Sequence, residues 1–195
     1  MSKPFVIIIT GLSGTGKTTL GKHLAQRYNL PCIHKDGIKE VLFDTIENCS
    51  AELSRKLGLS SVLLLHYVTI ALVTAGQSLI VEANFNPKLA TSEWLTLKEK
   101  YNFETLQIQC HTEGTVLLDR FKKRIGTKER HPGHYDRVEL EYIKSGLLQG
   151  RQENLEIGGY VYELDTTDFE RVNYQSLYAA IETKLKLHPR GENIE

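Results

Sequence analysis

Short apolar runs recur along this chain and alternate with longer segments in which apolar residues repeat with the period of a helix. The short runs predict buried strands, and the longer segments predict helices that pack against them. This alternation is typical of a parallel sheet with crossover helices. The predicted strands span residues 4–10, 32–35, 78–83, 103–110 and 160–164. The pattern therefore predicts the α/β fold class.

Helical periodicity begins soon after the first strand. Leu20, Leu24 and Tyr28 fall on one face of a helix, and Asn29 with Pro31 ends that helix before the second strand. Further helices are predicted over residues 37–46, 53–75, 88–101, 113–125, 138–149 and 174–187. A strand, a glycine-containing loop and a helix thus follow one another at the start of the chain.

The length of 195 residues suits one domain. Because no repeat or long linker interrupts the pattern, residues 1–187 are expected to form a single domain and residues 188–195 a mobile tail. The most apolar stretch, residues 62–75, is shorter than the roughly 20 residues of a membrane span. We therefore expect a buried helix there and no membrane segment. Part of that helix is a candidate dimer face, so the protein is expected to be a monomer or a homodimer.

The glycine-containing loop reads Gly11-Leu12-Ser13-Gly14-Thr15-Gly16-Lys17-Thr18 and matches G-x-x-x-x-G-K-[ST] at every fixed position. Glycines allow a positive φ and close backbone approach, so that amide groups converge on phosphate oxygens at a helix N-terminus. A glycine-rich turn without a ligand is the alternative, but the preceding strand and following helix favour nucleotide binding. The residues expected to bind the nucleotide are Gly11, Ser13, Gly14, Thr15, Gly16, Lys17, Thr18 and Thr19.

Two of these residues have separate chemical roles. Lys17 is expected to reach the β- and γ-phosphates, and the Thr18 hydroxyl to ligate the Mg²⁺ that bridges them. Glu82 ends the third strand, where P-loop proteins commonly place an acidic residue that holds magnesium or its waters. The sequence therefore predicts ATP and Mg²⁺ as ligands, with Thr18 and Glu82 at the metal.

Other classes of P-loop protein lack support in this sequence. It contains neither the Asn-Lys-x-Asp motif of GTPases nor the Leu-Ser-Gly-Gly-Gln signature of transporters, and it has no room for the helical lid domain of large ring ATPases. A kinase is the class that remains.

Asp36 follows the second strand, and ligands of open α/β sheets bind beyond the carboxyl ends of the strands. Its carboxylate is a candidate base for an attacking hydroxyl, with Lys39 one helical turn later holding the acceptor or a phosphate. The other interpretation of Asp36 is a helix N-cap. Asn84 and Asn86, after the third strand, are candidate substrate contacts or turn residues before Pro87.

Basic residues cluster between residues 120 and 137, where the sequence has seven basic residues and only two acidic ones (Glu129 and Asp136). A solvated surface is one reading of this cluster. The other is a lid over residues 126–137 that brings arginines onto the transferring phosphate, with Arg120 and Arg124 one helical turn apart and pointing the same way. The candidate catalytic residues are Lys17, Asp36, Arg120, Arg124 and Arg130, and Arg137 is a candidate substrate contact.

His131 and His134 flank Pro132 and Gly133 in this lid. A metal pair lacks a further ligand at suitable spacing, so substrate contacts or lid closure are favoured. Thr166, after the last strand, is a candidate contact for the nucleotide base.

Charge and cysteine content indicate which binding partners and which cellular compartment are expected. Twenty-four basic and 24 acidic side chains balance, so there is no overall attraction to nucleic acid or anionic membranes. Cys32, Cys49 and Cys110 are odd in number and lack a Cys-x-x-Cys pair, which argues against a disulfide framework or zinc site and favours a cytoplasmic location.

These motifs resemble those of the P-loop kinases that include polynucleotide 5′-hydroxyl kinase, chloramphenicol phosphotransferase and zeta toxins, an AAA_33-like group. Residues 119–124 are also similar to the lid entrance of adenylate kinases. The resemblance implies a three-layer fold with a five-stranded parallel sheet in the order 2-3-1-4-5, ATP as donor, and Asp36 as the base. Two departures are Lys39, where relatives often have arginine, and a lid sequence that matches no one characterised substrate.

The leading hypothesis is an ATP-dependent kinase that phosphorylates a hydroxyl of a small metabolite or nucleotide. A nucleic-acid 5′-hydroxyl kinase is less favoured because the overall charge is neutral. An ATP-binding switch without an acceptor is the alternative from another class. Asp36 discriminates between them, because a binding module needs no base in an acceptor pocket.

Overall fold

The computed structural model describes residues 3–47, 50–128 and 130–186. The predicted tail at 188–195 and Cys49 lie outside the described residues. The sheet has five parallel strands in the order β2-β3-β1-β4-β5, as the resemblance implied. The strands are β1 (Phe5–Gly11), β2 (Cys32–His34), β3 (Leu79–Glu82), β4 (Glu104–His111) and β5 (Tyr160–Asp165). Each lies within about a residue of its predicted position.

Seven α-helices and two 3₁₀ helices of the described chain join these strands. The α-helices are α1 (Lys17–Tyr28), α2 (Lys35–Asp44), α3 (Ala51–Thr74), α4 (Pro87–Tyr101), α5 (Gly114–Arg124), α6 (Asp136–Gln149) and α7 (Tyr174–Leu185). The 3₁₀ helices are η1 (Pro132–His134) and η2 (Phe169–Arg171). Three helices start two residues earlier than predicted (α2, α3 and α6), because the apolar period does not show polar residues of a first turn.

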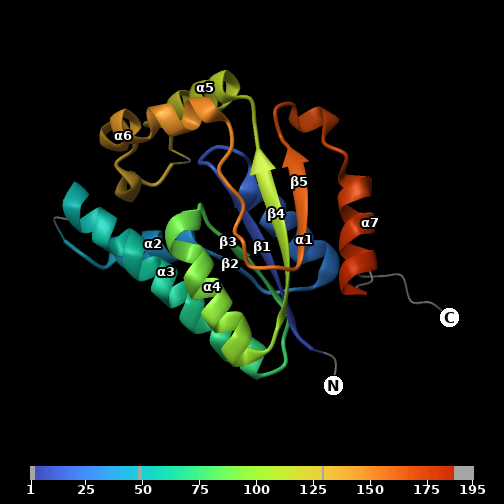
Figure 1. Cartoon of the computed structure of the whole chain (residues 1–195). Helices are drawn as coiled ribbons and strands as arrows, with labels where there is room; N and C mark the ends of the chain where they lie inside the picture. Colours follow the sequence, from blue (N-terminus) through green and yellow to red (C-terminus); the bar gives the residue numbers. More distant parts are fainter. Residues whose placement is uncertain (1–2, 48–49, 129, 187–195) are drawn as a thin grey trace.

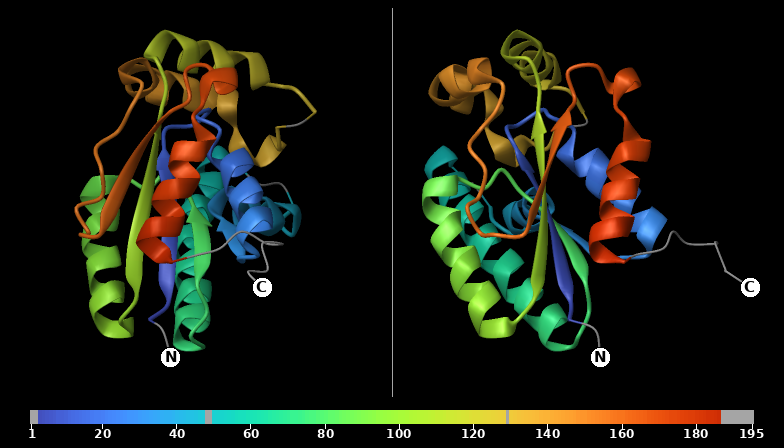
Figure 2. Two further views of the ribbon diagram at one scale, coloured as in Figure 1. Left: turned by 90° about the vertical axis from the view of Figure 1, so that its right-hand side faces the viewer. Right: turned by 45° about the vertical axis from the view of Figure 1, so that its right-hand side comes forward.

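Helices cover both faces of the sheet, which makes three layers (Figure 2). Every residue of β1 is buried, so the strand shows no polar face. Phe5, Ile7 and Ile9 belong to the core shared with α1 and α7, whereas Val6 and Ile8 belong to the core shared with α3 and α4. Successive side chains of a strand point to opposite faces, and each buried isoleucine contributes about 1.5–3 kcal/mol.

A smaller cluster lies beyond the carboxyl ends of the strands. It is formed by Leu117 and Phe121 of α5 and Leu147 of α6, all nearly inaccessible to solvent. In Figure 1 these two helices lie at the upper left, beyond the arrowhead of β4. The edge of the sheet at which ligands of this architecture bind is therefore roofed by α5, α6 and the segment between them.

The long apolar helix α3 is buried on one face only. Leu57, Leu65 and Val73 are buried, but Leu63 is 57% exposed and Tyr67 is 71% exposed. The prediction of a buried helix is thus wrong for the outer face, because a helix that is apolar all round does not reveal which side meets the sheet. By length and composition α3 is also long and apolar enough to cross a membrane, with 33% of its apolar window buried in the fold.

Candidate functional site

The phosphate-binding loop links β1 to α1 and has the backbone of an anion cradle. Gly11, Gly14 and Gly16 all have positive φ values, of 140°, 95° and 81°. A Cβ atom on Gly11 would lie 2.2 Å from the carbonyl oxygen of Cys110, so the loop passes too close to β4 for any side chain. Gly16 caps α1 without a side-chain hydrogen bond, which leaves the first amides of the helix for a ligand.

Lys17 is folded back over its own loop. Its side chain is 8% exposed, and Nζ donates to the carbonyl oxygen of Leu12 at 2.9 Å. The same Nζ lies 4.0 Å from Oε1 of Glu82. The ammonium group is therefore held beside the loop, between a carbonyl and a carboxylate.

Thr18 and Glu82 meet as the magnesium prediction requires. Oγ1 of Thr18 donates to Oε2 of Glu82 at 2.8 Å, across 64 residues of sequence. Glu82 lies opposite Ile9 in the parallel pairing of β3 with β1, which carries its side chain to the loop. A hydroxyl and a carboxylate oxygen are the hard ligands that Mg²⁺ accepts together with several waters. These two residues fit a magnesium ion.

Asp36 does not cap its helix. The N-cap of α2 is His34, whose Nδ1 accepts a hydrogen bond from the amide of Gly37 at 3.0 Å. The N-cap interpretation of Asp36 is therefore wrong, because the histidine before the helix already satisfies that amide. The Asp36 carboxylate is left to face other side chains.

The Asp36 carboxylate lies between two cations. Its Oδ1 is 3.4 Å from Nζ of Lys35, its Oδ2 is 3.4 Å from a guanidinium nitrogen of Arg130, and the side chain remains 39% exposed. Partial burial alone would raise its pKa, but the charges of Lys35, His134, Arg130 and Lys17 hold the pKa well below its ordinary value. Asp36 is therefore ionised throughout the physiological range.

Asp36 shares a cavity of about 130 Å³ with the phosphate-binding loop. The cavity is lined by Ser13, Lys17, Lys35, Asp36, Glu82, Asn84, Phe121, Arg130, His134, Asp136, Glu139 and Ile143. Lys35, which sequence reasoning missed although it precedes Asp36, also donates to Oδ1 of Asn84 at 3.4 Å. The loop, the proposed base and the predicted lid thus converge on one space.

The described residues of the lid segment, 126–128 and 130–137, contact α2 and α3. His134 Nε2 lies 2.8 Å from Oε1 of Glu40, and His131 Nε2 lies 3.0 Å from Oδ1 of Asp44. Phe43 packs edge-on against His131, and a Cβ on Gly133 would lie 2.6 Å from the Phe43 ring. Both histidines therefore bind carboxylates of α2, contacts that the sequence could not show.

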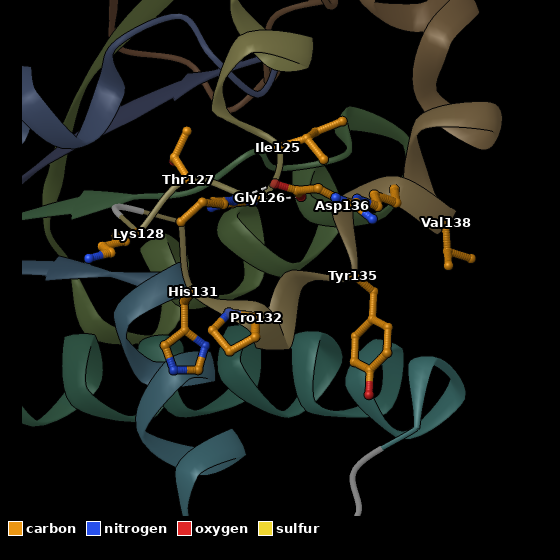
Figure 3. A pocket seen from close by; sticks show the side chains of 11 residues that line it. Ile125, Gly126, Thr127, Lys128, His131, Pro132, Tyr135, Asp136 and Val138 are labelled. Atoms are coloured by element: carbon orange, nitrogen blue, oxygen red, sulfur yellow. Dashed lines mark hydrogen bonds and ion pairs between the residues drawn. The ribbon is translucent and has the colours of Figure 1, made fainter.

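Arg130 and Asp136 join the two ends of this segment. Nε and Nη2 of Arg130 donate to the two carboxylate oxygens of Asp136 at 2.6 and 3.0 Å. Both residues line a hollow formed by this segment. Figure 3 shows Asp136 in this hollow, with His131 and Tyr135 pointing toward the helices below and Lys128 pointing aside. Asp136 thus orients the Arg130 guanidinium, which also contacts Asp36.

Arg120 and Arg124 diverge, contrary to the expectation that both point the same way. Arg120 donates to the carbonyl oxygens of Thr166 and Thr167 at 2.8 Å each and lies 4.0 Å from the ring centre of Phe169. Arg124 donates to Oγ of Ser13 at 2.5 Å. Although the two arginines lie one helical turn apart, Arg120 therefore binds the segment after β5, whereas Arg124 binds the phosphate-binding loop.

Three other predicted contacts lie apart from the cavity. The Thr166 side chain is buried, with its hydroxyl bonded to Thr112 Oγ1 at 2.7 Å and to the carbonyl oxygen of His111 at 2.9 Å. Arg137 is exposed and lines the hollow of Figure 3, and Thr19 is exposed on α1. Among described residues, no group of three His, Cys, Asp or Glu side chains forms a further metal cluster.

Known proteins share this architecture. The sequence profile of the AAA_33 family, described as an AAA domain, matches residues 6–147. A crystal structure from Chloroflexus aurantiacus, of a protein assigned as a kinase, is 34% identical with a TM-score of 0.85, and the match covers 94% of this chain and 99% of that one. No curated protein matches significantly.

More distant structures share the fold alone. A sugar kinase from Janibacter is 19% identical with a TM-score of 0.56, over 96% of this chain and 97% of that one. The tunicamycin resistance protein of Deinococcus radiodurans is 15% identical with a TM-score of 0.55, over 96% of this chain and 98% of that one.

Proposed function

This chain belongs to the AAA_33 family and has the fold of P-loop kinases, and from that premise we propose that it transfers the γ-phosphate of ATP to a hydroxyl group of a small molecule or nucleotide. One observation carries the proposal. The Asp36 carboxylate and the Lys17 ammonium line the same cavity. A protein that only binds a nucleotide has no need of a base in an acceptor pocket.

The donor side of the site consists of the phosphate-binding loop, Thr18, Glu82 and Arg124. The loop amides and Lys17 would bind the phosphates, and Thr18 with Glu82 would hold Mg²⁺. When bound, magnesium neutralises charge on the β- and γ-phosphates. Nε of Arg124 is buried and has no hydrogen-bond partner within the described chain. This donor is therefore free to bind a phosphate oxygen of the nucleotide.

On the acceptor side, Asp36 takes the proton of the attacking hydroxyl. The hydroxyl oxygen forms a bond to the γ-phosphorus, the bond from that phosphorus to the β–γ bridging oxygen breaks, and ADP leaves with the electron pair. A carboxylate of low pKa is a weak base, which suits a reaction in which the hydroxyl proton is lost late. Arg130, held by Asp136, orients Asp36 and supplies positive charge near the transferred group.

The size of the cavity favours a small acceptor. About 130 Å³ is less than the space of a typical ligand pocket, roughly 300–1,000 Å³, and Arg130, His134 and Asp136 of the lid segment line it. The charge of the chain also favours a small acceptor over a nucleic acid. Its 24 basic side chains are balanced by 24 acidic ones, whereas nucleic-acid binding relies on an excess of basic side chains that contact phosphates. Arg120, engaged with the loop after β5, holds the region where the base is expected to lie.

The test is transfer from γ-labelled ATP to a panel of metabolites, nucleosides and 5′-hydroxyl oligonucleotides, with and without Mg²⁺. We expect label on a small hydroxyl compound, loss of labelling without Mg²⁺, and loss in Lys17→Ala. Label on oligonucleotides alone would indicate a nucleic-acid kinase. Phosphate release to water with no labelled acceptor would indicate the switch and would overturn the proposal.

Glu82→Gln provides a second measurement on the same panel. The substitution keeps the length of the side chain and removes its charge, so the Mg²⁺ concentration for half-maximal labelling should rise about tenfold or more if Glu82 holds the ion or its waters. Glu93→Gln on α4, at an exposed side chain, is the matched control and should leave the Mg²⁺ dependence unchanged. An equal response of both variants would remove Glu82 from the metal site.

A further inference from the structure

A second cavity lies at the end of the sheet opposite the phosphate-binding loop. Its volume is about 390 Å³, and residues of α4, α7 and the amino ends of β4 and β5 line it. In the pairing of β1 with β4, Phe5 lies opposite Glu104 at this end and Gly11 lies opposite Cys110 at the loop. Six residue steps of about 3.3 Å separate the two ends, which makes about 20 Å. A ligand in this cavity therefore takes no part in the transfer proposed at the loop.

The lining of this cavity carries an excess of positive charge. Lys3, Lys98 and Lys184 line it with a single carboxylate, that of Glu104, so three ammonium groups against one carboxylate leave a formal charge of +2. In the part of the chain that the structure describes, no carboxylate lies within ion-pair distance of any of these lysines. The fold thus gathers three like charges without neutralising them.

Lys98 is the lysine whose position is fixed by the fold. Its Nζ donates to Oγ1 of Thr105 at 3.2 Å and to the carbonyl oxygen of Ile157 at 3.0 Å. An ammonium group has three donors, so one remains for another acceptor. Partial burial lowers the pKa of Lys98, and the charge of Lys3 acts in the same direction, whereas Glu104 opposes it. This ammonium is held in place by neutral groups and lacks a contacting anion.

The turn before β5 forms one wall of the cavity. Oγ1 of Thr105 donates to the carbonyl oxygen of Gly158 at 3.1 Å. Gly159 has a φ of 91°, and a Cβ atom there would collide with the carbonyl oxygen of Thr105. Because β4 and α4 both hold this turn, the wall is in place before a ligand arrives, which lowers the entropic cost of binding.

We propose that this cavity binds a phosphate group, free or carried by a small phosphorylated compound, through Lys98 and Lys184. A phosphate monoester carries a charge of about −1.5 to −2 at pH 7, which the formal charge of the lining matches. Lysine binds phosphate as a point charge. The volume falls within the roughly 300–1,000 Å³ of small-molecule sites. An organic group would lie beside Tyr160, whose ring centre is 4.8 Å from Nζ of Lys184.

Backbone amides followed by NMR distinguish this cavity from the phosphate-binding loop. Gly158 and Gly159 report on the cavity, and Gly14 and Gly16 report on the loop. The protein is titrated with inorganic phosphate, glycerol 3-phosphate or glycerol, at constant ionic strength. We expect saturable shifts of the two cavity glycines with both phosphates and none with glycerol. A lower Kd for the ester identifies a phosphorylated compound as the ligand, and a lower Kd for inorganic phosphate identifies the free anion.

Lys98→Met and Lys184→Met connect this binding to the lysines. Loss of the fixed ammonium of Lys98 should raise the Kd read at the cavity glycines about tenfold or more. Loss of the exposed Lys184 should raise it about threefold. The shifts of the loop glycines should stay as in the wild type. Lys100→Met, at an exposed lysine of α4 that lies over the ring of Tyr101, is the matched control and should leave both sets of shifts unchanged.

The two variants also separate binding from a structural role of Lys98. Lys98 fixes the turn before β5, so its variant may lose structure, whereas the exposed Lys184 makes no hydrogen bond in the described chain. The Lys184→Met result therefore decides if Lys98→Met has a lowered Tm. Shifts confined to the loop glycines, shifts that chloride reproduces at equal ionic strength, or a Kd of Lys184→Met equal to that of the wild type would overturn the inference. None of these outcomes bears on the kinase proposal, which labelled transfer tests separately.

Discussion

The carboxylate of Asp36 and the guanidinium of Arg130 lie 3.4 Å apart across 94 residues of sequence. This contact joins the start of α2 to the lid segment, so the proposed base and the roof of its cavity position each other. Arg130 is itself fixed by two hydrogen bonds to Asp136. A carboxylate placed this way is both ionised and oriented before a substrate arrives.

The first prediction concerns Asp36→Asn. An amide of the same shape cannot take the hydroxyl proton, so kcat should fall about 10²–10⁴-fold while the affinity for ATP stays within a few fold. Single-turnover transfer with labelled ATP and equilibrium binding of the nucleotide measure the two quantities. Asp119→Asn, an exposed carboxylate of α5 paired with Lys123, is the control. An undiminished kcat in Asp36→Asn would remove this residue from the mechanism.

The second prediction concerns the contact of Arg124 with Ser13. If Arg124 leaves the Ser13 hydroxyl for a phosphate oxygen when ATP binds, Arg124→Ala should lower kcat/KM for ATP about tenfold or more. Ser13→Ala keeps the loop amide and removes only the competing hydroxyl, so it should leave turnover unchanged or tighten ATP binding slightly. Both are read from ATP titrations of the transfer rate.

The control for this pair is Lys123→Ala, which removes an exposed neighbour of Arg124. A surface ion pair is worth about 0–1 kcal/mol, so little change is expected. If Ser13→Ala and Arg124→Ala were equally damaging, the bond between them would be part of the working site rather than a contact that phosphate replaces.

The fold was largely predictable because its determinants are local. Five apolar runs and the glycine loop placed the strands, and the motifs led to the kinase family that the AAA_33 match confirms. The phosphate-binding loop is specified by its own residues, since only glycine tolerates the approach of Gly11 to Cys110. Thr18 and Glu82 were also placed together correctly, because parallel strands deliver their ends to the same edge of the sheet.

Contacts between distant elements were not predictable in this way. His34 rather than Asp36 caps α2, because the backbone turn before the helix decides which side chain reaches the Gly37 amide. The exposed face of α3 followed from how that helix packs, which its uniform apolar sequence does not show. Phe169, which stacks with Arg120, lies in a segment without any motif. These features depend on tertiary packing, which the periodicity of apolar residues does not reveal.

The third prediction concerns Gly133, where the lid segment meets Phe43. A Cβ at this position would lie 2.6 Å from the ring, so Gly133→Ala must displace Phe43. The lid segment packs against Phe43 and would therefore shift as well. We expect a three- to tenfold rise in the acceptor KM, about 0.6–1.4 kcal/mol of lost binding, and a lower Tm. Steady-state kinetics and thermal unfolding measure the two effects.

Gly146→Ala is the matched control for this substitution. Gly146 lies inside α6 with nothing within 4 Å of an added Cβ, so alanine should stabilise the protein by about 0.5–1 kcal/mol without a change in KM. A Gly133→Ala protein with wild-type kinetics would show that the contact between Phe43 and the lid does not govern the acceptor site.

The last prediction concerns pH and His134. This histidine is 6% exposed and lies 2.8 Å from Glu40. Burial lowers its pKa below the ordinary value, assisted by the positive charges of Arg130 and Lys39, while Asp36 and Glu40 act in the opposite direction. In the unfolded chain the same group binds its proton near pH 6.5. Below that pH the unfolded state therefore holds more protons than the native state, and the free energy of unfolding should fall as pH falls.

Urea denaturation between pH 7.5 and 5.5 measures this dependence. The free energy of unfolding should decline over this range in the wild type, and the decline should be shallower in His134→Gln, which keeps a donor for Glu40 but does not titrate. Burial also lowers the pKa of His66, so a remaining slope of the same sign is expected in the variant. An unchanged or steeper slope in His134→Gln would show that the lid histidine is not held neutral by its burial against α2.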